Sequence, residues 1–568
     1  MVTATTMAQP DFLAQGRALS ACASICAYSL VFTTVSPAIV AADTTVTPEI
    51  ETSAYGFWLR DEQAGPGLDK GLAMKASPAI TVTHKGRQSF ASFNVENESV
   101  WYDDSQRSHK SLTNYNASSG ISIFDNRMSI QLNAQSGHQV RSAQNNIFSD
   151  IITGSDNLSK TSSYGAALSF ANLSSAVVQT KVNVSYKKFT SDQPEVDDGI
   201  NNFDNDSLQG TLQLAAGTRG VGAFWLVSGN FNKTIRESDQ DFESQQANLI
   251  AGLPLFTNLS AIVRASYQDS SNGQSGSGIG NFGGYFDTYK SYGAGLEYRF
   301  GTVSYINVTQ NKAIRSGQLA LPGDDNDNDS ENNNDNYYAT ELYLPPSRRS
   351  TLLYRYDRQF FGRTTTVVGQ YNMRTVTARL SVSETLQVLS NLSQVFEDLG
   401  IFVCPAGSQQ LGDCVKPPTN NYQLQPGESL QQFIQPGFDI SEELVKRRLA
   451  AFSLGYANRR LKLNLSLSQI EDEYEESLRS SQTKVISTTS SWQIGRLTRF
   501  SLSASHYDLS YSTDDRKDKN ILVETGFERE LNEHATVKLM FRRTVRNSSQ
   551  QTFDLAENRV WLSYSHRL

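Results

Sequence analysis

The chain has 568 residues, with 50 Lys and Arg against 58 Asp and Glu, and its formal net charge is −8 at neutral pH. This modest negative charge, without a basic patch interleaved with aromatics, argues against a general nucleic-acid-binding protein. Beyond the N-terminal segment, no run approaches the roughly 20 apolar residues that a transmembrane helix needs. The mean hydropathy of −0.42 does not exclude a membrane barrel, because barrel strands are only half apolar.

The first 42 residues are predicted to form a cleavable signal peptide. An apolar stretch, Ala18–Val31, follows the only preceding basic residue, Arg17, and leads to small residues that end at Ala42. This order of basic, apolar and small residues is typical of an export signal. A retained membrane anchor is the alternative, but the small-residue exit favours cleavage near Ala42.

Downstream of the leader, apolar and polar residues alternate with a period of two almost throughout. The run 461–468, LKLNLSLS, shows the pattern without a break. Such alternation predicts strands with one apolar and one polar face. The strands predicted in chain order are 46–59, 75–85, 88–103, 117–125, 128–141, 161–171, 175–189, 206–216, 221–235, 241–252, 257–270, 286–300, 302–315, 348–360, 363–385, 440–456, 459–472, 482–494, 498–511, 517–530, 534–547 and 554–567.

The connections between these strands are predicted to alternate between short and long. Gly and Asn supply the backbone conformations that tight hairpins need, and the short turns include Lys85-Gly86, Asp125-Asn126, Phe300-Gly301, Phe361-Gly362, Ala457-Asn458 and Leu531-Asn532. Long polar loops are expected at 104–116, 142–160, 190–205, 271–285, 316–347 and 386–439. We therefore predict one domain, 43–568, forming an antiparallel transmembrane β-barrel of about 22 strands (range about 18–24) in the bacterial outer membrane, with short periplasmic turns and long extracellular loops.

Two of the long loops have unusual compositions. Within 316–347, the acidic residues Asp325, Asp327 and Asp329 are spaced like the start of a calcium loop, although the Gly and Glu of such a loop are absent. Weak Ca²⁺ binding and plain solvated surface are the two interpretations, and no other cofactor is expected. The loop 386–439 is predicted to be a lumen constriction, an external cap or a tolerated insertion.

The loop 386–439 also holds the two cysteines that remain after the leader is removed. Cys404 and Cys414 lie close together in a polar segment of an exported chain. This placement predicts one local disulfide, because exported proteins fold in an oxidising compartment.

Basic residues gather on the later strands, and several fall on the polar phase of their strand. The candidates for cations that line the lumen are Lys462, Arg499, Lys538, Arg542 and Arg379. A lumen lined by cations would favour anionic solutes. The alternative is that these cations pair with carboxylates such as Glu524 or Glu528, which would stiffen the wall without giving selectivity.

The sequence contains no convincing catalytic constellation. His506, between Ser505 and Tyr507, is the single candidate for a barrel hydrolase, because such an enzyme needs a histidine beside a serine nucleophile. Its expected role is that of an ordinary polar residue of the lumen or the interface. We assign no catalytic residues and expect a non-enzymatic protein.

The stretch 440–449, ISEELVKRRL, followed by 458–463, NRRLKL, resembles a known family over the final third of the chain. That family is the outer-membrane β-barrel proteins associated with PEP-CTERM/exosortase systems and exopolysaccharide loci in Gram-negative bacteria. The resemblance implies a pore or scaffold for exopolysaccharide export or surface assembly, with no catalytic residues to carry over.

Three functions are therefore expected in order of preference. The first is the exopolysaccharide pore or scaffold. The second is a general porin or uptake channel for small solutes, including anionic ones. The third is a barrel hydrolase acting on lipid or polysaccharide. Outer-membrane lipid and lipopolysaccharide, the barrel assembly machinery, and polysaccharide with its export machinery are the expected partners. No nucleic acid is expected.

Overall fold

A computed structural model of the chain describes residues 43–61, 69–103, 107–124, 127–140, 147–172, 177–192, 203–217, 222–236, 241–272, 286–301, 304–317, 333–347, 349–359, 362–388, 401–405, 428–432, 444–474, 479–512 and 515–568. The predicted signal peptide, 1–42, lies outside these residues and stays a prediction. No helix of the described residues is long and apolar enough to cross a membrane.

Strands account for nearly all of the described chain. The first half contains β1 (Asp43–Asp61), β2 (Asp69–Lys85), β3 (Ser89–Tyr102), β4 (Lys110–Ile123), β5 (Met128–Val140), the short helix η1 (Ser155–Asn157), β6 (Leu158–Asn172), β7 (Gln179–Ser191), β8 (Phe203–Ala216), β9 (Phe224–Arg236), β10 (Phe242–Phe256), β11 (Leu259–Asn272) and β12 (Phe286–Arg299). The second half contains β13 (Tyr305–Gly317), β14 (Asn333–Ser347), β15 (Ser350–Gln359), β16 (Gly362–Asn372), β17 (Val376–Val388), β18 (Ile401–Pro405), β19 (Glu428–Gln432), β20 (Leu444–Ala457), β21 (Leu461–Tyr474), β22 (Ser480–Gln493), β23 (Thr498–Tyr511), β24 (Lys517–Glu530), β25 (Ala535–Ser548), the short helix η3 (Gln551–Phe553) and β26 (Leu555–Arg567).

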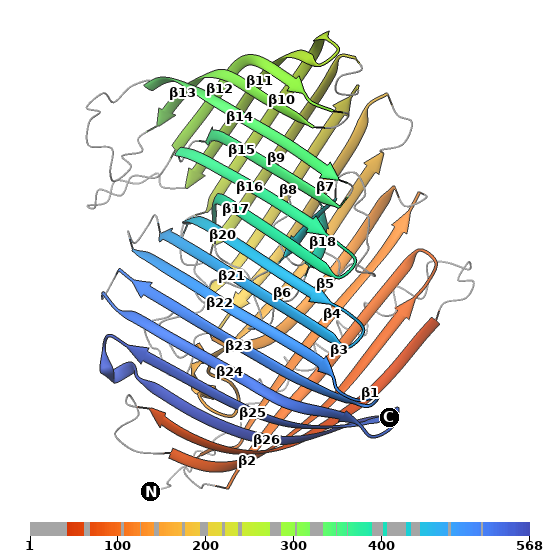
Figure 1. The fold of residues 1–568 in the computed structure, drawn as a ribbon, viewed down its shortest axis with the longest axis vertical. Helices are drawn as coiled ribbons and strands as arrows, with labels where there is room; N and C mark the ends of the chain where they lie inside the picture. The colour runs from red at the N-terminus through yellow and green to blue at the C-terminus, as the bar shows by residue number, and fades with distance from the viewer. Residues whose placement is uncertain are drawn as a thin grey trace, which may run out of the picture.

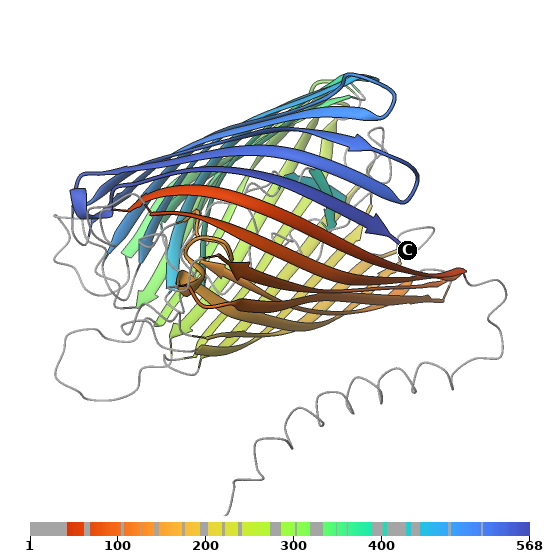
Figure 2. The ribbon, with the colours of Figure 1, turned by 90° about the horizontal axis from the view of Figure 1, so that it is seen from below.

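The strands form one closed ring. Each strand of the 24-stranded sheet pairs antiparallel with its neighbours, and β1 pairs with both β2 and β26, which closes the sheet on itself. The pairing of β17 with β20 continues the ring, while β18 and β19 pair only with each other. Figures 1 and 2 show an elongated ring, with β18 drawn inside it. Glu49 pairs with Arg567, so the start of the barrel lies beside its end.

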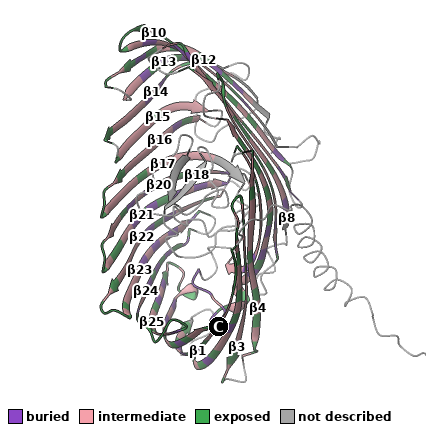
Figure 3. Cartoon of the chain, turned by 90° about the vertical axis from the view of Figure 1, so that its right-hand side faces the viewer, coloured by how far each residue is buried: buried purple, intermediate pink, exposed green. Residues whose placement is uncertain are grey.

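The predicted alternation appears in the burial of the strands, as the alternating colours of Figure 3 show. On β21, Leu463 is 41% exposed, whereas Ser466 on the opposite phase is 2% exposed. Large apolar side chains are exposed on the same face around the ring, among them Met74, Val184, Leu253, Val263, Ile486 and Leu539. A closed ring with an apolar outer face satisfies its backbone internally and presents a suitable surface to lipid. The predicted barrel and its outer-membrane location are confirmed.

The strand count exceeds the expected 22 in two places. The strand β14 lies within the segment predicted as the loop 316–347, because the acidic run before it hides its alternation. The predicted strand 363–385 is two strands, β16 and β17, joined by a turn in which the Met373 N–H donates to the Val376 carbonyl at 2.7 Å. That turn contains neither Gly nor Pro, and its one sequence signal is Asn372 at the end of β16. Because β14 adds one strand before it, the short turn at Phe361-Gly362 lies at the end of the barrel that carries the long loops, and not at the end of the short turns as predicted.

The ring bends sharply at β12, where β11 and β13 approach each other. Two inward glycines permit this bend: a Cβ on Gly293 would lie 2.1 Å from Asn311 Oδ1, and one on Gly295 would lie 1.9 Å from the Val308 carbonyl oxygen. The bend also lets Arg264 of β11 reach Glu341 of β14, with 3.3 Å between Nη2 and Oε2. The narrow end of the oval therefore depends on glycine at these positions.

We expect Gly295→Ala to weaken closure of the barrel, because the added methyl group would overlap backbone atoms, and overpacking of this kind costs about 1–3 kcal/mol. The measurement is the loss of the folded band on an unboiled gel during refolding in graded urea. Gly210→Ala is the matched control, since the nearest atom to its added Cβ lies 4.0 Å away. Equal urea midpoints for the two variants would contradict the argument.

Candidate lumen constriction

The connection between β5 and β6 folds into the ring instead of standing outside it. We call residues 147–157 the inner segment; they lie within the predicted loop 142–160. Ile147 and Phe148 are 1% and 2% exposed, and Ile151 and Ile152 are 7% and 3% exposed. In Figure 1 the inner segment is the orange curl at the end of the ring that contains β24 and β25, and Figure 3 draws it between the β25 and β4 walls.

Apolar contacts anchor the inner segment at both of its ends. Ile147 and Phe148 pack on inward side chains of β22 to β24, and Phe148 meets the Tyr507 ring edge-on at a centroid distance of 5.9 Å. Ile151 and Ile152 pack on inward side chains of β1 to β3, including Phe57. Full burial of an apolar side chain of this size contributes about 1.5–3 kcal/mol, so these contacts are strong enough to hold the inner segment in the lumen.

An ionic clamp centred on Asp150 lies between the two apolar anchors. Arg559 of β26 donates to both carboxylate oxygens, at 2.6 Å from Nη1 and 3.1 Å from Nη2. Arg542 of β25 donates from Nη1 at 3.0 Å. The N–H groups of Ile152 and Thr153 also donate to Oδ1, at 3.0 Å each. This two-pronged arginine contact fixes the orientation of the carboxylate as well as its charge.

Side chains behind the clamp hold Arg559 in place. Its Nε donates to Glu557 at 2.7 Å, and its Nη2 donates to the Thr153 hydroxyl at 2.6 Å. The Thr153 hydroxyl donates in turn to Glu557 at 3.1 Å, and the Tyr102 hydroxyl donates to the Ile151 carbonyl at 2.8 Å. The inner segment is therefore tied to β3, β25 and β26 by directional bonds as well as by packing.

The clamp changes the protonation of Asp150. Burial by itself would raise the pKa of this carboxyl, but the charges of Arg559 and Arg542, with the hydrogen bonds, lower the pKa to about 2. The side chain keeps 29% of its exposure, so solvent screens part of the interaction. A lowered pKa means that the clamp stabilises the docked segment above the ordinary carboxyl range and loses this contribution as the pH falls towards 2.

The structure pairs three of the five cations predicted to line the lumen. Arg542 binds Asp150, Arg499 meets Glu528 at 2.6 Å, and Lys538 lies 4.0 Å from Glu51. Because Lys75 also meets Glu98 at 2.8 Å, the inner wall from β23 round to β3 carries opposite charges in pairs. Paired charges of this kind support the stiffening alternative over anion selectivity.

Arg379 and Lys462 complete the predicted set. Both lie on the inward phase of their strands, where Arg379 is opposite Gln370 and Ser453 and Lys462 is opposite Ala457 and Ser491. Neither has a carboxylate within ion-pair distance among the described residues. These two positions are the remaining candidates for unbalanced positive charge in the lumen.

The other predicted sites are not brought together in the described chain. Asp325, Asp327, Asp329 and Cys414 lie outside it, so the calcium and disulfide predictions stay predictions. Cys404 falls on β18. Within the described ranges no group of three or more His, Cys, Asp or Glu could hold a metal ion. His506 lies opposite Ile486 and Ile521 on the outward phase, whereas Ser505 is on the inward phase, so the two do not form a catalytic pair.

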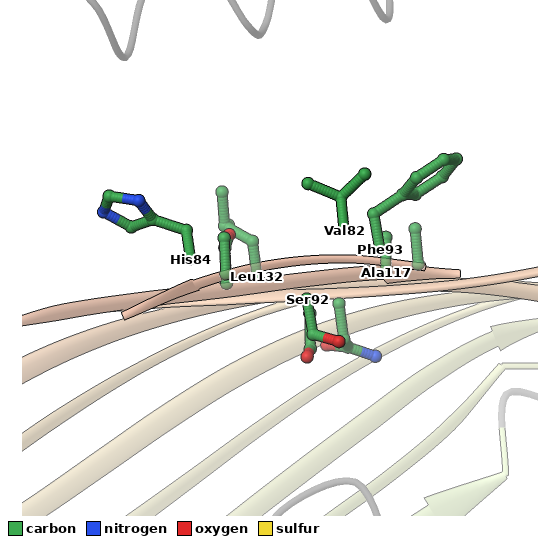
Figure 4. A pocket seen from close by; sticks show the side chains of 11 residues that line it. Val82, His84, Ser92, Phe93, Ala117 and Leu132 are labelled. Carbon is green, nitrogen blue, oxygen red and sulfur yellow. The ribbon is translucent and has the colours of Figure 1, made fainter. Parts of the chain in front are cut away.

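A shallow groove of about 260 Å³ lies on the other side of the wall. Figure 4 shows Val82, His84, Phe93 and Leu132 on one side of the sheet and Ser92 on the opposite side. The lining of the groove is mostly apolar and belongs to the outward phase of β2 to β5. This groove faces lipid and is separate from the lumen.

The inner segment was not predicted from the sequence, although the sequence contains a signal for it. The pairs Ile147-Phe148 and Ile151-Ile152 are apolar side chains in an otherwise polar connection. In a solvated extracellular loop such pairs would be exposed to water, whereas in a connection that packs inside the ring they are buried.

Neither a protein-family model nor a curated protein sequence matches the chain. Among solved structures, the chain is similar to the FrpB iron transporter from Neisseria meningitidis (F3-3 variant), at 8% identity and TM-score 0.42 over 92% of this chain and 81% of that one. The siderophore receptor PirA from Acinetobacter baumannii gives 8% and 0.40 over 93% and 81%. OccAB3 from Acinetobacter baumannii gives 9% and 0.28 over 92% and 99%. Likeness at this level transfers no function, and the fold assignment rests on the chain's own strand pairing.

We expect Asp150→Asn to loosen the inner segment while the barrel stays folded, because the variant loses the charge that two arginines share. Hydrogen bonds to charged groups contribute about 1.5–3 kcal/mol each. Hydrogen exchange measured by mass spectrometry should accelerate for the peptide that covers 147–157 and stay unchanged in β25 and β26. Asp156→Asn is the control, since the side chain of Asp156, which pairs with Lys110 at 3.0 Å, is 54% exposed. Unchanged exchange in the Asp150 variant would rule out the clamp.

Proposed function

We propose that the protein is a porin-like, non-enzymatic channel that passes small polar solutes across the outer membrane, with the inner segment narrowing its bore. The observation that carries the proposal is the contrast between the two faces of the wall. Apolar side chains point outward, whereas inward positions hold hydroxyl, amide and paired charged groups. A wall of this kind is compatible with a water-filled lumen.

The described histidines support a channel rather than a hydrolase. His84 contacts the Thr44 hydroxyl at 2.8 Å, and His138 contacts the Asn114 side chain at 3.1 Å. His506 faces outward without its neighbouring serine. Within the described ranges, none of these histidines is paired with both a nucleophile and an orienting carboxylate, which acyl or glycosyl transfer would need.

The exopolysaccharide pore or scaffold stays a prediction from the sequence resemblance. No contact among the described residues bears on export machinery. The channel proposal needs no partner beyond the membrane and can be tested on the purified barrel alone.

The first test is single-channel recording of the refolded barrel in a planar bilayer. We expect steady conductance steps from the unaltered protein. Arg559→Gln should give noisier and larger steps, because removing the two-pronged contact releases the inner segment from the wall. Arg499→Gln is the control, since it breaks the charge pair with Glu528 on the same wall and leaves the inner segment alone. A barrel that shows the folded gel band but conducts no current would refute the channel.

The acid response of the conductance provides a second test. Because the pKa of Asp150 is lowered to about 2, conductance should be constant from neutral pH down to the ordinary carboxyl range. It should then become noisy as the pH falls towards 2 and the carboxylate is protonated. Asp150→Asn should be noisy already at neutral pH and show no further step. A step at the same acid pH in both proteins would assign it to another carboxyl group.

A further inference from the structure

The inner wall formed by β7 to β10 differs chemically from the charged wall formed by β23 to β3. In register across these strands, Asn183 faces Thr211, Thr211 faces Asn230, and Asn230 faces Gln246. The row on one side, Ser185, Gln209, Asn232 and Ser244, has the same chemistry, and the row on the other side continues it from β8 to β10 but has Lys181 on β7. We call the whole set the amide wall, and it consists of Asn183, Ser185, Gln209, Thr211, Gln213, Ser228, Asn230, Asn232, Ser244, Gln246 and Asn248.

Burial and alternation place the amide wall on the lumen side. The residues between its members carry the apolar outer face, where Val184, Leu208, Leu212 and Leu249 are 38–40% exposed. Because successive side chains of a strand point to opposite faces, the members of the amide wall point inward. The members of the amide wall are neutral hydroxyls and carboxamides, and two cations of β7, Lys181 and Lys187, flank them on the same face. Each of these lysines already interacts with another group.

Several of these groups have unused hydrogen-bonding capacity. Thr211 and Asn230 are exposed to the lumen. Asn232 Oδ1 is buried without a hydrogen-bond partner. Within the described ranges, Thr211, Asn230 and Gln246 form no side-chain hydrogen bond. In contrast, the wall from β23 to β3 holds charged groups that are paired with one another, such as Arg499 with Glu528 and Lys75 with Glu98. The amide wall can therefore offer bonds to a passing molecule that these paired groups cannot.

We propose that the amide wall is a binding track for neutral oligosaccharides; this inference rests on the proposed channel and names its preferred solute. Hydroxyl and carboxamide groups both donate and accept hydrogen bonds, which matches the mixed donor and acceptor character of sugar hydroxyls. Neighbouring strands lie about 4.8 Å apart, close to the length of one sugar unit. Without formal charge, the patch offers an ion no attraction that water does not already provide.

The experiment uses maltohexaose, a neutral sugar, in a planar-bilayer recording of the refolded full barrel. We expect concentration-dependent blocking of the current by maltohexaose and much weaker blocking by an anionic oligogalacturonate of the same length. The double variant Thr211→Leu/Asn230→Leu should need about tenfold more maltohexaose for half-block, because a tenfold change is the effect expected from two lost net hydrogen bonds. Its open-channel conductance should stay close to that of the unaltered protein.

The matched control is Thr489→Leu/Ser503→Leu. This pair faces across β22 and β23 in the same way, but it lies outside the amide wall. We expect its half-block concentration to be unchanged. All proteins are checked for the folded band on an unboiled gel, so that loss of blocking is separated from loss of folding.

The outcomes separate the two proposals. A folded barrel without conductance would overturn the channel itself. Steady conductance that maltohexaose does not block would leave the channel standing and overturn the sugar track. Blocking that both double variants weaken equally, or neither weakens, would likewise overturn the assignment to β7–β10, because the wall would then act only as a general hydrophilic lining.

Discussion

Closure of the strand ring is the constraint on which the rest of the structure depends. Lipid offers no hydrogen-bond partners, so each backbone group in the membrane must be satisfied by a neighbouring strand. The pairing of β1 with β26 removes the last free edge, and side chains reinforce it: Ser53 and Ser563 meet at 2.8 Å on the inner face. Once the ring is closed, period-two alternation determines which side chains meet lipid and which meet the lumen.

The lumen is divided chemically rather than lined uniformly. One side, from β23 round to β3, carries paired charges and the inner segment, while the wall from β7 to β10 carries the neutral groups of the amide wall, flanked by Lys181 and Lys187. The paired charges hold structure in place, since removing one partner would leave an uncompensated charge. Thr211, Asn230 and Gln246 of the amide wall form no side-chain hydrogen bond with the described residues, so these groups can interact with solutes.

Period-two alternation predicted the fold well, because it is a local property that the barrel geometry uses directly. It failed at β14, where an acidic run precedes the strand, and at the turn near Met373, where Asn372 is a weak turn signal. The partners of the lumen cations could not be predicted, because Asp150 and Arg559 lie far apart in the chain and meet only through the inward fold of a connection. Arg542 was correctly placed in the lumen, but its role depends on a residue that no strand pattern could indicate.

The inner segment joins the beginning of the barrel to its end. Its apolar residues Ile151 and Ile152 rest on β1 to β3, which are synthesised first, whereas Asp150 binds arginines of β25 and β26, which are synthesised last. The clamp can therefore form only after the final strands have joined the first ones. The inner segment can therefore bind both groups of strands only in a barrel in which β1 and β26 are paired. In a barrel that is open between β1 and β26, the inner segment would not be bound at both of its ends.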